Sequence, residues 1–315
     1  MKKIGIALVL AGSSCLAHAE NSSVEIYGLI DLNIGKDVGS TATREANGTV
    51  SNFGFKGTED LGGGMSAFFN LKSRFDANNG AIHGGAVDNG TPFWGSTSIV
   101  GLAGSFGKVF VGRALSEAAV GSQLIVDPWL WEHVTNAYFI TGGGVAHIWY
   151  SNSLSYEYNN SGFSFGLQAA NQANNSLWGA MTTTPVNGNM RYAAGPVSVG
   201  VSYEKTGEGP AKWTTIDAQY MLGSASLRAA IGDGTNLNNA TVKSAFVAAV
   251  VPVGVMTYIM SYGMAETADV ITTAKASAGA SYSLSKRTSL YTNVTYDTKV
   301  ASSKSGVEFG ISHAF

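Results

Sequence analysis

Between residues 51 and 75 the chain alternates regularly between apolar and polar positions. Phe53 and Phe55 mark the apolar side of the first stretch, and Lys56 lies on its polar side. A glycine-rich segment at 59–64 separates it from a second alternating stretch. Period-two alternation around such a turn predicts a hairpin whose strands each have one apolar and one polar face. The pattern fits a soluble sandwich with an apolar core, or a transmembrane barrel with its apolar face toward lipid.

Alternating segments of the same kind recur along the chain, with polar spacers between them. They predict sixteen strands, at 24–34, 49–58, 64–76, 93–103, 107–113, 150–158, 162–171, 188–194, 197–205, 212–222, 224–231, 240–251, 254–263, 272–283, 287–298 and 304–315. After the N-terminal leader described below, no segment has a 3.6-residue apolar stripe long enough to predict a helix. The predicted fold class is therefore all-β.

The connections between these strands alternate between short turns and long polar loops. The short ones are 60–63, 104–106, 159–161, 195–196, 222–223, 252–253 and 284–286. The long ones are 35–48, 77–92, 114–149, 172–187, 206–211, 232–239, 264–271 and 299–303. Short turns at one rim and long loops at the other are typical of a transmembrane 16-stranded antiparallel β-barrel. An even strand number also lets the first and last strands pair, which removes the sheet edges.

The stretch from Ala245 to Met264 carries no charged residue, so a membrane-spanning helix is an alternative there. Pro252 and Gly254 interrupt its middle. A strand, a turn and a second strand fit better, because each half is close to the ~9–11 residues that a barrel strand needs. The inward-facing positions of this stretch are more apolar than a water-lined wall requires.

The N-terminal segment 1–19 has the features of a secretory signal peptide. Lys2 and Lys3 precede a short apolar run, and the small residues at 17–19 supply a cleavage site. Cleavage there leaves 20–315 as a single barrel domain. It also removes the chain's one cysteine, so the barrel is expected to fold without disulfides.

Composition adds two constraints. Only 13% of the residues are charged and the formal net charge is −2, which argues against a nucleic-acid partner. The patterns GxSxG, HExxH and CxxC are absent, and His83, His133 and His147 lack metal-ligand spacing. We therefore expect no enzyme activity, cofactor or metal. Besides a diffusion channel, an outer-membrane barrel enzyme and a secreted β-rich adhesin remain as alternatives.

Several motifs along the chain carry a family resemblance. They are VEIYGLIDLNI near the start, GFKGTEDLGGG in the first hairpin, IVGLAGSFGKVFVGR at 99–113, SNSLSYEY at 151–158, LSKRTSLY at 284–291 and the closing ISHAF. With these the chain resembles the general Gram-negative porins of the β-proteobacterial type, which include neisserial and Burkholderia-like porins.

The resemblance implies a homotrimer of barrels in the outer membrane, surrounded by lipid and lipopolysaccharide. Each barrel would pass ions and small hydrophilic solutes by passive diffusion, and its third loop would fold into the pore. The resemblance also implies that Phe315, the last residue, is recognised by the barrel-assembly machinery.

The candidate site is a constriction formed by this loop, residues 114–149, and the facing wall. Glu117, Asp127 and Glu132 are the candidates for its acidic side. On the basic side, alternation points five residues inward: Lys56, Lys72, Arg74, Arg191 and Arg228. Arg113 joins them because it matches the family motif. The alternative for each of these residues is that it is simply solvated in a loop or in the lumen and has no role in selectivity. A charged residue on the lipid face would cost ~2–4 kcal/mol, so an inward position needs no functional reason.

Three positions depart from the family pattern. Asn52, Ser96 and Trp149 stand where such porins usually carry arginine. These replacements remove positive charges from the pore wall, while the acidic residues of the loop remain. We therefore expect at most a weak preference for anions, and more readily a mild preference for cations.

Overall fold

The computed structural model describes residues 23–83, 92–172, 175 and 181–315. The predicted signal peptide at 1–19 lies outside the described residues.

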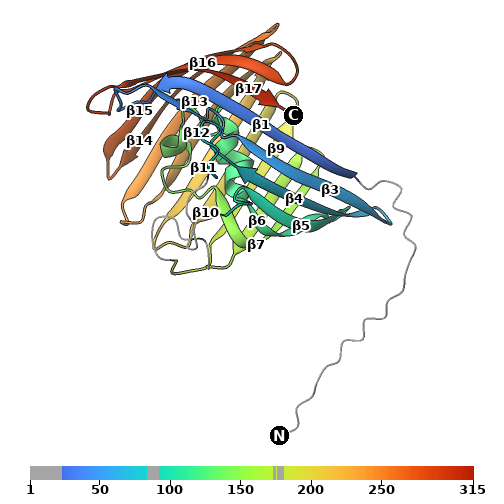
Figure 1. The fold of residues 1–315 in the computed structure, drawn as a ribbon. Coiled ribbons are helices and arrows are strands. Elements are labelled where there is room, and N and C mark those ends of the chain that lie inside the picture. Colours follow the sequence, from blue (N-terminus) through green and yellow to red (C-terminus); the bar gives the residue numbers. More distant parts are fainter. Residues whose placement is uncertain (1–22, 84–91, 173–174, 176–180) are drawn as a thin grey trace.

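The chain forms a closed antiparallel barrel of sixteen long strands, with one additional short strand, β2 (Arg44–Ala46), in the first loop (Figure 1). The first eight long strands are β1 (Ser23–Lys36), β3 (Asn52–Gly62), β4 (Met65–Arg74), β5 (Thr97–Gly104), β6 (Gly107–Leu115), β7 (Trp149–Asn160), β8 (Phe163–Ala170) and β9 (Val186–Ala194). The other eight are β10 (Val197–Lys205), β11 (Lys212–Leu222), β12 (Ala225–Thr235), β13 (Thr241–Val253), β14 (Met256–Thr267), β15 (Val270–Ser283), β16 (Thr288–Asp297) and β17 (Ser305–Ala314). The sixteen-stranded prediction is confirmed, whereas β2 was not foreseen.

The barrel closes where β1 pairs with both β3 and β17. Beyond the last strand, Phe315 exchanges two backbone hydrogen bonds of 3.1 Å with Gly28. The aromatic ring of Phe315 lies over Gly28, where an added Cβ would come within 2.3 Å of it. The C-terminal residue therefore seals the seam, and it needs a residue without a side chain beneath it.

The register between β1 and β3 shows which face of each strand meets water. Ile26 pairs with Phe55, and Ile26 is 63% exposed on the outside of the barrel. Asp31 and Asn33, on the other face of β1, are buried inside. Because directly paired residues share a face, Phe55 and its neighbour Phe53 point outward, as predicted.

The stretch at 245–264 forms the end of β13 and most of β14, joined by a turn in which Gly254 has a φ of 61°. No helix within the described ranges is long and apolar enough to cross a membrane. The prediction of a long loop at 264–271 is wrong. Strand β14 ends at Thr267 and β15 begins at Val270, so that only a two-residue turn joins them.

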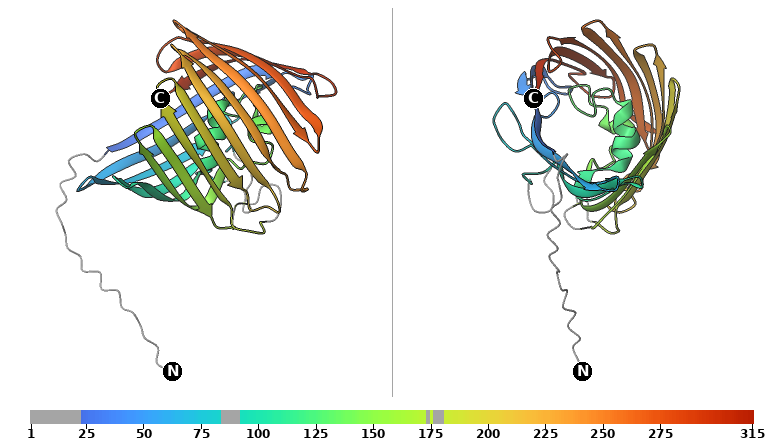
Figure 2. Two further views of the ribbon diagram at one scale, coloured as in Figure 1. Left: turned by 180° about the vertical axis from the view of Figure 1, so that it is seen from behind. Right: turned by 90° about the vertical axis from the view of Figure 1, so that its right-hand side faces the viewer.

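The connection between β6 and β7 enters the barrel. It contains the π-helical turn η1 (Ala119–Gln123) and the short helices α1 (Leu124–Val126) and α2 (Tyr138–Thr141). Viewed along the barrel, this helical segment lies inside the ring of strands (Figure 2).

The unexpectedly apolar inner wall at β13 faces this loop. Phe246 and Ala248 of the wall form a buried cluster with Val126, Ala137 and Ile140 of the loop. The inward positions of this strand are apolar because they pack against protein rather than water.

Candidate functional site

The segment between β6 and β7, residues 116–148, is called the constriction loop from here on. Its two ends are held together by a hydrogen bond of 2.8 Å from the Ser116 amide to the Ile148 carbonyl. The loop therefore leaves the wall and returns to it at nearly one point, and its helical segment lies inside the ring of strands (Figure 2). A buried loop must satisfy its backbone polar groups, and the wall supplies many of the partners.

Basic wall residues on one side anchor the loop. Arg191 donates to the Gly121 carbonyl at 3.0 and 3.2 Å, and Arg228 donates to the Ile125 carbonyl at 2.7 Å. Arg191 also forms an ion pair of 2.5 Å with Asp217. These two predicted wall positives are thus engaged by the loop backbone and by a wall carboxylate.

Glu132 and Arg74 meet on the other side of the lumen. Their ion pair is 2.5 Å long, and the second Glu132 carboxylate oxygen accepts the Val50 amide. The Arg74 guanidinium lies 4.8 Å from the centre of the Trp149 ring, a cation–π contact. Trp149, at a position where the family resemblance leads us to expect an arginine, thus contacts Arg74 of β4, although β5 and β6 lie between the two strands. Lys72 lies two residues earlier, and its side chain makes no hydrogen bond or ion pair within the described residues.

Asp127 does not reach the water of the lumen. It is fully buried, and its carboxylate accepts the backbone amides of Trp129 (3.0 Å), Trp131 (2.9 Å) and Ala137 (3.3 Å). Burial raises its pKa, while these three amides act in the opposite direction. The expectation of a pore-lining Asp127 needs correction, because this side chain organises the loop from within.

Glu117 lies in a third environment. Its side chain is only 3% exposed and sits against Gly166, where an added Cβ would come within 2.1 Å of Oε2. Burial raises the pKa of Glu117 to about 8, and the nearby Glu157 carboxylate raises it further while Lys108 opposes this. At pH 7 Glu117 is therefore mostly uncharged and contributes little negative potential.

Two other predicted wall residues lie apart from these contacts. Arg113 is at a β-bulge between β6 and β7, where it donates to the Gly95 carbonyl at 2.6 Å and to Ser151 at 2.8 Å. Lys56 pairs with Glu25 at 3.2 Å. The structure thus brings Arg74, Arg191 and Arg228 to the loop but keeps Arg113 and Lys56 away from it.

The loop also reaches the wall at β16 and β17, a contact that the sequence reasoning missed. His133 Nδ1 lies 2.6 Å from Glu308 Oε1, and the Trp129 indole donates to Asn293 at 2.9 Å. Glu308 is fully buried. The sequence offered one signal for this contact, the carboxylate of Glu308 on the polar face of the last strand. A buried carboxylate needs a partner, and here the loop supplies it.

These features define a class of protein. The barrel has an apolar outer face, a polar lumen and a loop that narrows this lumen from inside, which is the architecture of a transmembrane diffusion channel. Comparison with known proteins gives the family. The model of the Gram-negative porins matches residues 6–302, and the chain belongs to this family.

Individual relatives agree with this assignment. The chain is 28% identical to outer membrane porin protein 32 of Delftia acidovorans, with both chains covered completely. It is 37% identical to the major outer membrane protein P.IB of Neisseria meningitidis serogroup B, over 41% of this chain and 38% of the relative. Among solved structures, the anion-selective porin from Comamonas acidovorans aligns with a TM-score of 0.75 and 23% identity, covering 94% of this chain and 100% of that one. The chain is thus an outer-membrane porin, a water-filled channel for ions and small hydrophilic solutes.

Proposed function

We propose that this porin is a general diffusion channel of weak charge selectivity. The observation that carries the proposal is the mutual compensation of the constriction charges. Glu132 pairs with Arg74, Arg191 pairs with Asp217, and Asp127 and Glu117 are buried. Paired or neutral groups leave little net charge to repel one ion sign, and screening at physiological salt limits what remains to ~8 Å.

The anion selectivity named for the Comamonas acidovorans protein is not carried over to this chain. Asn52 is buried and donates to the Val50 carbonyl at 2.9 Å, and Ser96 is also buried. At both positions, where the family resemblance leads us to expect an arginine, the wall offers a neutral side chain. This supports a lumen with fewer free positive charges.

The remaining selectivity depends on wall cations without an ion-pair partner in the described residues. Arg228 is one, but it is bound to the Ile125 carbonyl, whereas the Lys72 side chain is unengaged. Lys72 lies on the polar face of β4 beside Arg74 and has no ion-pair partner in the described parts of the chain. An unpaired ammonium in a narrow lumen attracts anions and offsets the chain's slight excess of acidic residues. The sign of the residual selectivity is therefore set by very few side chains.

The test is the reversal potential across a salt gradient in a planar bilayer. Lys72→Gln should shift the wild-type value toward cations. Lys243→Gln, which removes a lysine beside Glu266 and Asp269 away from the constriction, is the matched control and should leave it unchanged. Strong selectivity in the wild type, or equal shifts in the two variants, would contradict the proposal.

We further propose that the protein assembles as a homotrimer, contacts lipopolysaccharide, and is inserted through recognition of Phe315 by the barrel-assembly machinery. An in-vitro folded trimer form is named for OmpT, an outer membrane protein of Vibrio cholerae that shares the fold at 13% identity with a TM-score of 0.70. We also propose that the barrel has no enzymatic activity. Within the described residues, no group of three or more His, Cys, Asp or Glu is placed to hold a metal ion.

A further inference from the structure

Two aromatic rings meet on the lumen wall between the constriction loop and the short-turn rim. Phe68 of β4, Gly101 of β5 and Phe110 of β6 stand side by side in register. The two rings are 6.1 Å apart at an interplanar angle of 65°. A Cβ on Gly101 would lie 2.5 Å from Phe110 Cβ and 2.8 Å from Phe68 Cζ. The rings therefore converge over a position that has to be glycine.

This aromatic pair departs from the alternation that governs the rest of the wall. Phe68 has the same phase as Ser66, Asn70 and Lys72, whose side chains belong to the water-lined face. Phe110 is buried, whereas Phe68 remains partly exposed. The constriction loop explains the apolar wall at β13, but the apolar cluster under the loop does not include this pair. The Phe68 ring is thus partly open to the lumen, and within the described residues the apolar clusters of the constriction loop do not cover it.

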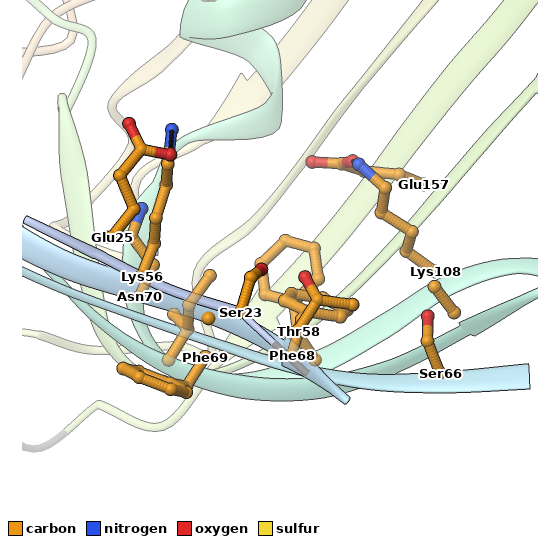
Figure 3. A pocket seen from close by; sticks show the side chains of 14 residues that line it. Ser23, Glu25, Lys56, Thr58, Ser66, Phe68, Phe69, Asn70, Lys108 and Glu157 are labelled. Atoms are coloured by element: carbon orange, nitrogen blue, oxygen red, sulfur yellow. Dashed lines mark hydrogen bonds and ion pairs between the residues drawn. The ribbon is translucent and has the colours of Figure 1, made fainter. Parts of the chain in front are cut away.

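Two ion pairs border the rings. Lys56 Nζ lies 3.2 Å from Glu25 Oε2, and Lys108 Nζ lies 3.4 Å from Glu157 Oε2. The four side chains are between 39% and 59% exposed, so solutes reach them. Together with the rings they line a cavity of about 530 Å³, within the range of small-molecule sites. In Figure 3 the four charged side chains rise on the same side of the strands, above Phe68.

We propose that this cavity is a binding subsite for small aromatic zwitterions, of which the aromatic α-amino acids are the simplest. The ring of the solute lies on Phe68, its carboxylate meets Lys56 and its ammonium group meets Glu25. An exposed ion pair contributes little by itself, so its members exchange partners readily. A zwitterion replaces both partners at once and leaves no charge unpaired. An anion or a cation would leave one member of the ion pair without a partner.

The subsite rests on the open channel and gives it a preference among solutes of equal size. A ring contact of this kind changes affinity by about 3- to 10-fold. A solute that pauses on the aromatic pair is concentrated next to the constriction. The solutes whose local concentration increases are therefore aromatic zwitterions.

The experiment measures current noise and transient block of the reconstituted full-length porin in planar bilayers, with L-phenylalanine or L-leucine added on the short-turn side. Both probes are zwitterions, and only the first has a ring. Three variants are compared. Phe68→Leu removes the ring, and the double variant Glu25→Gln, Lys56→Gln removes the ion pair without altering the net charge. Phe165→Leu, on the outer face of β8 where it pairs with the exposed Met190, lies outside the cavity and is the matched control.

Each block is referred to the open conductance of the same variant without solute, which separates failure of the subsite from failure of the channel. We expect L-phenylalanine to bind the wild type more tightly than L-leucine. Binding should weaken about 3- to 10-fold in Phe68→Leu, be lost in the double variant, and stay unchanged in Phe165→Leu. Equal block by both probes, no block of a normally conducting wild type, or equal loss in Phe68→Leu and Phe165→Leu would overturn the proposal.

Discussion

Glu117 and Asp127 are carboxylic acids of the same loop, yet their surroundings give them different roles. Asp127 accepts three backbone amides, which compensate an ionised carboxylate for the water it has lost. Among the described residues Glu117 has no such donors, and burial raises its pKa to about 8. The residue type alone predicts two pore charges. The local hydrogen bonds turn one into a structural element and the other into a group that titrates.

The pH dependence of selectivity follows from Glu117. Because its pKa is raised from 4.5 to about 8, its burial carries no penalty below about pH 4.5 and becomes steadily less favourable as the pH rises from there to about 8, where the buried group ionises. Ionisation then adds a negative charge to the lumen. Between pH 7 and pH 9 the reversal potential should move toward cations, and Glu117→Gln should abolish this step. A step of the same size in Glu117→Gln would show that another group titrates.

At the level of strands and loops, Ile140 of α2 links the constriction loop to the wall. It is 1% exposed and belongs to the apolar cluster with Phe246 and Ala248. Ile140→Ala leaves a cavity, and such a change typically lowers stability by about 2–5 kcal/mol. Here the loss weakens the attachment of the loop to the wall and leaves the barrel itself folded. We expect increased gating noise and easier proteolysis of the loop, with unchanged heat-modifiable gel migration.

The matched control for this change is Phe139→Ala. Phe139 is the neighbouring residue on α2, and its side chain is 63% exposed. Removing it creates no buried cavity, so current noise and protease sensitivity should stay at the wild-type level. If both variants behave alike, the loop is not held by the apolar cluster.

The elements could be predicted largely because strand alternation is local. The first hairpin and the turn at Gly254 needed only neighbouring residues, and their faces followed from the period of two. The partners of the loop could not be found in this way. His133 and Glu308 are 175 positions apart, and no pattern within either segment indicates that they meet. Likewise, nothing in the sequence around Arg228 shows that it binds a loop carbonyl instead of facing water.

For the assembled barrel, the C-terminus carries the clearest expectation. Phe315 pairs its backbone with Gly28 and is 43% exposed on the outer surface. Deleting Phe315 removes both the seam contact and the proposed recognition residue. The amount of folded protein in the outer membrane should fall several-fold, as measured by heat-modifiable migration of membrane fractions, while export across the inner membrane continues. Normal outer-membrane levels of the deletion would refute the proposed role.

The attachments of the constriction loop also have a mechanical consequence. Arg74 lies on the third long strand and Arg228 on the eleventh, which is half-way round a barrel of sixteen, and the loop binds both. It therefore spans the full diameter and works as a cross-brace. A thin cylindrical wall under lateral pressure from the membrane flattens toward an ellipse unless opposite sides are tied together. Cutting the loop would then do more than widen the opening, because the cross-section itself would lose its stiffness.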